Sequence, residues 1–147
     1  MRIVLCENGL IDSQGHHFNL AAGLKEELAA RDIPLAVWAH VAIDPRFREE
    51  LGATATFEWS PYDPFTSRTR SGHIRRFLVG ARKFGSALVR GDLRPDDVLL
   101  ITCARPAEIL GIATSLRRGG VQPCAQRITS LRFPTGRDST RIGLATF

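Results

Sequence analysis

The sequence lacks paired cysteines, long apolar runs and much aromatic content. Its three cysteines, Cys6, Cys103 and Cys124, are widely spaced and form no CxxC pair, so we expect reduced, mostly buried thiols. No run approaches the roughly 20 apolar residues that span a bilayer. The opening MRIVLCEN reaches Glu7 too soon for the apolar core of a signal peptide. We therefore expect a cytoplasmic protein, or a domain that faces the cytoplasm.

Lysine is also scarce: arginine outnumbers it 18 to 2. Residues 1–73 carry 7 basic and 10 acidic side chains, whereas residues 74–147 carry 13 basic and 5 acidic ones. A basic half suits nucleic acid, an anionic membrane surface or a phosphorylated ligand, and it is equally consistent with an ordinary solvated face. The sequence lacks aromatic interleaving and any recognised nucleic-acid-binding motif, so we expect no nucleic-acid partner.

The order of apolar patterns predicts an α/β protein. Near-continuous apolar runs predict strands at 2–8, 35–41, 54–59 and 98–102, with a weaker one at about 124–133. Helical patterns lie between them, at 17–31, 44–52, 72–90 and from 106 to about 119. We predict a Rossmann-like, doubly wound parallel sheet of about five strands in a three-layer α/β/α arrangement, with strand order 3-2-1-4-5. Residues 1–133 would form this domain, and 134–147 a polar tail or the truncated start of another element.

Two helices carry further local signals. The shorter one, 44–52, has an aspartate for its amino-terminal cap, a proline at its first position and a glycine to end it. The 72–90 helix has an apolar stripe expected to join the core, formed by Ile74, Phe77, Leu78, Ala81, Phe84 and Leu88. Its basic side chains lie off that stripe and leave peripheral contact with an anionic membrane open.

The expected topology puts the candidate site at two loops. In a doubly wound sheet, ligands bind beyond the carboxyl ends of the strands, where neighbouring connections diverge. The loops 7–17 and 102–108 meet there, and each leads into a helix amino terminus that suits phosphate or carboxylate. Gly15 allows close backbone approach, and Arg105 could add a bidentate charged contact. Neither GxGxxG nor GxxxxGK[ST] is present, which disfavours a dinucleotide fingerprint or a P-loop.

Two interpretations of the pair His16 and His17 stay open, and a third, a metal site, is disfavoured. Adjacent residues on a helix point about 100° apart, so they do not ligate one metal as an i, i+4 pair does, and we expect no metal. One histidine could act as an acid–base group. The pair could equally be a polar helix start, capped by Asp12 or Ser13. Asn19 adds a polar group to the first turn, and Cys103 is either a nucleophile in the cleft or a packing residue.

Long segments resemble bacterial glycosyltransferases of the GT-B architecture. The stretch RIVLCENGLIDSQGHHFNLAAGLKEELAARDIPLAVWAH resembles their opening strand, glycine-containing loop, helix and second strand. The segment PDDVLLITCARPAEILGIATSLRR is similar to a later strand–helix unit, and LRFP fits the next strand. The resemblance covers most of residues 1–133.

The resemblance implies a function and a site. Such enzymes have two Rossmann-like domains, of which the amino-terminal one mostly holds the acceptor and the other holds the nucleotide-sugar donor. Because the sequence ends at Phe147, we expect no donor domain, no cofactor and no activity from this chain alone. The acceptor would be a glycan, a lipid or a small molecule, and a second glycosyltransferase domain would be the partner. His17 is the catalytic candidate, and the ligand-binding candidates are Asn8, Asp12, Gly15, His16, His17, Asn19, Cys103 and Arg105. The alternative is a non-catalytic Rossmann-like module that binds a phosphorylated ligand or a partner protein.

Overall fold

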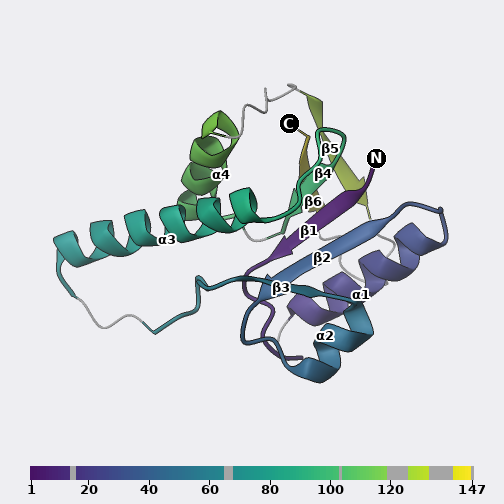
Figure 1. The fold of residues 1–147 in the computed structure, drawn as a ribbon, viewed down its shortest axis with the longest axis horizontal. Helices are drawn as coiled ribbons and strands as arrows, with labels where there is room; N and C mark the ends of the chain where they lie inside the picture. The colour runs from purple at the N-terminus through teal and green to yellow at the C-terminus, as the bar shows by residue number, and fades with distance from the viewer. Residues whose placement is uncertain (14–15, 65–67, 103, 119–125, 133–140, 147) are drawn as a thin grey trace.

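The computed structural model describes residues 1–13, 16–64, 68–102, 104–118, 126–132 and 141–146. Strands and helices alternate through the first 118 residues (Figure 1). The elements are β1 (Ile3–Glu7), α1 (His16–Ala29), β2 (Leu35–His40), α2 (Pro45–Leu51), β3 (Thr54–Phe57), α3 (Arg70–Arg90), β4 (Val98–Ile101), α4 (Pro106–Arg118), β5 (Gln126–Arg132) and β6 (Arg141–Thr146).

Four of the strands form one parallel sheet in the order β3-β2-β1-β4. In its centre, Ile3 of β1 lies opposite Leu35 of β2 and Val98 of β4. The fold class and the order of these four strands are confirmed. The fifth strand does not join this sheet, because β5 pairs antiparallel with β6 in a separate two-stranded sheet. Its sequence, QRITSLR, is mostly polar, unlike the apolar runs that a doubly covered parallel sheet buries. The segment 134–147, expected as a polar tail or the truncated start of another element, contains β6.

The helices cover the sheet on both faces and produce three layers. Helices α1 and α2 share one apolar cluster with alternate residues of the strands, among them Leu5, Val37 and Leu100. Helices α3 and α4 share a second cluster on the opposite face, which includes Val4, Trp38, Phe57, Phe84 and Ile112. Figure 1 shows these two pairs of helices on either side of the sheet. The period of two along each strand is what divides its side chains between the two clusters.

Local signals in the sequence account for the bounds of α2. The Asp44 side chain accepts a hydrogen bond from the Arg46 backbone N–H at 2.9 Å, and Pro45 occupies the first helical position. Gly52 ends the helix in the left-handed conformation, with φ of 63°, which a residue without Cβ adopts at little cost. These three predictions are confirmed.

Helix α3 departs from the expected burial. Ala81, Phe84 and Leu88 are buried as predicted, but Ile74 is 52% exposed and Leu78 is 53% exposed. At 1.5 Å per residue, this 21-residue helix is about 31 Å long, whereas the longest strand of the parallel sheet has six residues and spans about 20 Å. Its amino-terminal half therefore extends past the sheet (Figure 1). Among the described residues, no helix combines the length and apolar character needed to cross a membrane.

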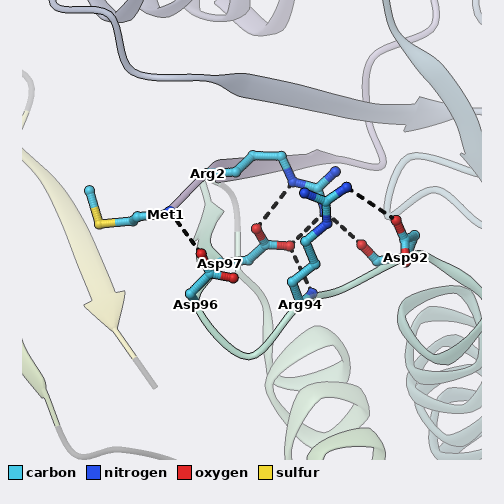
Figure 2. Close-up of polar contacts among 6 residues, drawn as sticks. All are labelled: Met1, Arg2, Asp92, Arg94, Asp96 and Asp97. Carbon is cyan, nitrogen blue, oxygen red and sulfur yellow. Dashed lines mark hydrogen bonds and ion pairs between the residues drawn. The ribbon is translucent and has the colours of Figure 1, made fainter.

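Ionic contacts tie the residues just before β1 to the loop before β4 at the amino end of the sheet (Figure 2). The Arg2 guanidinium donates to both carboxylate oxygens of Asp97, at 3.1 and 2.6 Å, and to the Asp92 carbonyl at 2.6 Å. The Arg94 backbone N–H donates to the same carboxylate at 2.9 Å. Burial alone would raise the pKa of Asp97, but the hydrogen bonds from Arg2 and Arg94 outweigh it and hold that pKa below its usual value. This cluster lies at the opposite end of the strands from the candidate site.

Candidate functional site

The carboxyl ends of β1 and β4 bring polar residues from two loops together. The two strands are hydrogen-bonded neighbours, with Cys6 opposite Ile101. The chain leaves β1 for α1 on one face of the sheet and leaves β4 for α4 on the other. Glu7 ends β1, and Thr102 follows β4 directly. This is the divergence point at which parallel α/β sheets bind ligands.

A chain of hydrogen bonds links Glu7, His17 and Tyr62. The His17 Nδ1 atom lies 2.6 Å from Glu7 Oε2, and its Nε2 atom lies 3.2 Å from the Tyr62 hydroxyl. An ionised carboxylate only accepts hydrogen bonds, so Nδ1 carries the hydrogen and donates it to Glu7. In the neutral imidazole, Nε2 then accepts from the Tyr62 hydroxyl. The carboxylate thus fixes the tautomer in which Nε2 is the basic atom.

The polar groups at the buried end of this series of hydrogen bonds all have partners. Glu7 is 1% exposed and His17 is 6% exposed. The second Glu7 oxygen accepts a hydrogen bond from the Thr102 hydroxyl, so both carboxylate oxygens have a partner. A buried charge is tolerated only with such partners. A carboxylate held in this way both orients the imidazole and stabilises its protonated form, which is the arrangement that general acid–base catalysis uses.

Next to this chain lies a second buried carboxylate, that of Glu108. One of its oxygens accepts a hydrogen bond from the Asn8 side chain, and the other from the Arg105 backbone N–H, both at 3.1 Å. Arg105 immediately precedes α4, and Glu108 is the third residue of that helix. A third-position glutamate that reaches back to the cap N–H is one half of a capping box. Glu108 therefore caps the amino terminus of α4 and also ties this helix to the loop after β1.

The loop after β3 closes over these residues. Arg105 lies over the ring of Tyr62, with its guanidinium carbon 5.0 Å from the ring centroid, and donates to the Pro61 carbonyl at 3.2 Å. Gly9 allows Tyr62 to approach His17: a Cβ atom at position 9 would lie 2.7 Å from Tyr62 Cε2 and 3.0 Å from His17 Nε2. The close approach requires glycine at this position.

The ligand-binding candidates divide into three groups. Asn8, His17 and Arg105 come together at the carboxyl ends of β1 and β4. The exposed group consists of Asp12, His16 and Asn19, with the His16 ring 4.2 Å from that of His17. Gly15 and Cys103 lie outside the described residues.

Four members of the cluster were not among the site residues predicted from the sequence: Glu7, Tyr62, Thr102 and Glu108. A carboxylate that ends an apolar run, as Glu7 does, is a usable signal. Thr102 and Glu108 lie in the very loop that was expected at the site. Tyr62 gave no signal beyond its place in a long loop with two prolines. Within the described part of the chain, no three His, Cys, Asp or Glu side chains gather closely enough to hold a metal ion.

His40 and Cys6 are buried close to the same end of the sheet. His40 Nδ1 accepts from the Ala42 backbone N–H at 3.1 Å, and its Nε2 finds no partner among the described residues. Burial lowers the pKa of His40; nearby Asp63 opposes this effect and Lys83 adds to it. Burial also raises the pKa of the Cys6 thiol, with a smaller contribution from Glu7, so this thiol stays protonated and unreactive at neutral pH.

Comparisons with known proteins do not assign this chain to a family. No family model, no curated protein and no solved structure matches the chain.

Proposed function

We propose that this chain is the acceptor-side half of a glycosyltransferase with the GT-B architecture. Its role would be to bind an acceptor hydroxyl and remove the proton as a sugar is transferred from a nucleotide-sugar donor. The observation that carries the proposal is the buried hydrogen bond of 2.6 Å between Glu7 and His17 at the carboxyl end of β1. The resemblance of the sequence to GT-B enzymes in this same segment supports the choice of reaction.

The chemistry required of this half is modest. An acceptor hydroxyl is a weak nucleophile, and a base that takes its proton as the new bond forms accelerates the transfer by about 10²–10⁴-fold. His17 offers a lone pair on Nε2, and Glu7 stabilises the imidazolium that results. The donor and its leaving diphosphate would be held by a second domain. A glycan, lipid or small molecule remains the expected acceptor.

The test begins with the DNA downstream of the Phe147 codon. A second Rossmann-like domain encoded there is co-expressed with this chain, and release of nucleoside diphosphate is measured with a panel of nucleotide sugars and acceptors. We expect His17→Gln to lower kcat by about 10²–10⁴-fold with little change in KM. His73→Gln is the matched control, because it makes the same chemical change at an exposed position of α3 outside the candidate site, and it should retain activity.

Two outcomes would count against this proposal. An active pair that tolerates His17→Gln would remove the base from the mechanism. Absence of a donor domain, together with no saturable binding of any acceptor by the chain alone, would favour the alternative of a non-catalytic module for a phosphorylated ligand or a protein partner.

A further inference from the structure

We propose that the hydroxyl of Tyr62, and not the imidazole of His17, is the group that meets the acceptor, and that it relays the proton to Nε2. This inference rests on the proposed function, because it names the residue of the same site that contacts the substrate. It starts from the difference in exposure along the hydrogen-bonded chain. Glu7 and His17 are buried, whereas the residue Tyr62 is 52% exposed and its hydroxyl lies 3.2 Å from the basic nitrogen. Of the three residues in the hydrogen-bonded chain, Tyr62 is therefore the one that is open to solvent.

A phenol hydroxyl can carry out this relay because it both donates and accepts hydrogen bonds. As the acceptor oxygen attacks the sugar, its O–H bond breaks and the proton forms a new O–H bond with Tyr62. In the same step the original phenol proton leaves Tyr62 and bonds to Nε2. The net change is one proton moved from the acceptor to His17. Tyr62 ends as a neutral phenol, and the imidazolium lies beside the Glu7 carboxylate.

The position of Tyr62 is held from two sides, as a relay requires. Arg105 lies over its ring and donates to the preceding carbonyl, that of Pro61. Arg76 of α3 donates to the same carbonyl at 3.1 Å and to the Asp63 carbonyl at 2.7 Å. The Tyr62 backbone N–H donates to the Ser60 hydroxyl at 3.2 Å. Groups from α3, from the start of α4 and from the loop itself thus hold the phenol against His17.

The sequence offers an unusually clean probe, since Tyr62 is its only tyrosine. N-acetylimidazole acetylates phenols: the phenol oxygen bonds to the acetyl carbon, the carbon–nitrogen bond breaks and imidazole leaves with a proton from solvent. If Nε2 accepts the phenol proton during the attack, His17 accelerates the reaction. The rate constant at neutral pH is measured by mass spectrometry of the peptide that contains Tyr62, in normal and heavy water.

We expect His17→Gln to lower this rate constant by about tenfold or more, because a positioned base typically accelerates a reaction by about 10²–10⁴-fold. The substitution should also reduce the solvent isotope effect. His73→Gln, at an exposed position of α3 outside the candidate site, should leave both unchanged. Loss of packing alone would expose the phenol and raise the rate, which is the opposite direction. An equal or faster rate in folded His17→Gln would overturn the relay.

A second variant covers the case in which His17→Gln fails to fold. Gly9→Ala keeps all three groups of the chain, but its new Cβ displaces Tyr62 from the imidazole. It should also slow acetylation, and an unchanged rate would overturn the proposal.

The relay and the proposed function can fail separately. Acetylation of Tyr62 involves no sugar. If the variants slow acetylation but no transferase activity is found, the relay stands and the proposed function fails. An active reconstituted pair in which Tyr62→Phe leaves kcat unchanged would retain the transferase and remove the relay.

Discussion

Two glycine-to-alanine substitutions in helices should change stability in opposite directions. Gly23 lies in α1, and a Cβ added there meets no atom within 4 Å. Gly111 lies in α4 where it crosses α3, and a Cβ added there would lie 2.6 Å from the Ala81 carbonyl oxygen and 3.1 Å from the Gly85 backbone nitrogen. The chemical change is identical, so the difference between the two variants isolates the contact between the helices.

Magnitudes follow from two terms. Alanine is favoured over glycine inside a helix by about 0.8–1 kcal/mol, which applies to both positions. Overpacking costs about 1–3 kcal/mol and applies only to Gly111. The upper part of this range is appropriate, because the atoms in the way belong to a helix backbone and cannot turn aside as a side chain can. We therefore expect Gly23→Ala to stabilise the protein by about 0.8 kcal/mol and Gly111→Ala to destabilise it by about 1–2 kcal/mol.

Urea unfolding followed by tryptophan fluorescence and circular dichroism measures both changes. Gly85→Ala provides a reciprocal check: its Cβ would lie 2.7 Å from the Gly111 carbonyl oxygen, so it should destabilise as Gly111→Ala does. If Gly111→Ala instead stabilised the protein as much as Gly23→Ala, the close crossing of α3 and α4 would be refuted.

Two further predictions concern the core and a buried histidine. Phe84 is buried and stacks on Phe57 with ring centroids 4.9 Å apart, so Phe84→Ala should lower the free energy of unfolding by about 3–5 kcal/mol. Leu78→Ala, at an exposed position of the same helix, should lower it by less than about 1 kcal/mol. Equal losses in urea unfolding would contradict the burial pattern of α3. Because the pKa of folded His40 lies below its usual value near 6.5, the unfolded chain binds more protons just below that pH, and stability should rise with pH through this window. In His40→Asn, the free energy of unfolding should rise less steeply with pH between about pH 5 and 7 than in the unsubstituted protein. An unchanged pH dependence would argue that His40 is not buried.

The order of elements was predictable because each local pattern agrees with the topology. Apolar runs such as VLLI have no polar face to leave in water, so they predict strands of a covered parallel sheet. The case of α3 shows where this reasoning stops. Periodicity identified the face of α3 that turns inward, and Phe84 and Leu88 obey it. It could not tell that the sheet ends before Ile74 and Leu78, because strand lengths elsewhere in the chain decide how much of the helix is covered.

The sequence predicted where the polar cluster lies and three of its members, Asn8, His17 and Arg105, but not the others. The topology alone puts the loops after β1 and β4 side by side. Sequence reasoning named His17 as the catalytic candidate and both His16 and His17 as ligand-binding candidates. It could not predict which of the two is buried, because that depends on how α1 rotates against the sheet. The structure turns His17 inward to Glu7 and leaves His16 exposed. Tyr62 comes from a loop 45 residues further along, where neither periodicity nor spacing gave any signal.

Stability alone is a poor explanation for this polar cluster. Glu7, at the end of β1, and Glu108, in the first turn of α4, are two almost fully buried carboxylates, and each requires hydrogen-bond partners to be tolerated. Apolar side chains of similar volume in place of a buried ionic pair are often neutral or stabilising. Glu108 has a structural task, since it caps α4. Among the described residues, the two Glu7 oxygens accept from His17 and Thr102, neither of which is a backbone N–H of a helix start. The proposed acid–base role gives a reason for a carboxylate at this position, because only a charged partner both fixes the tautomer of His17 and stabilises its protonated form.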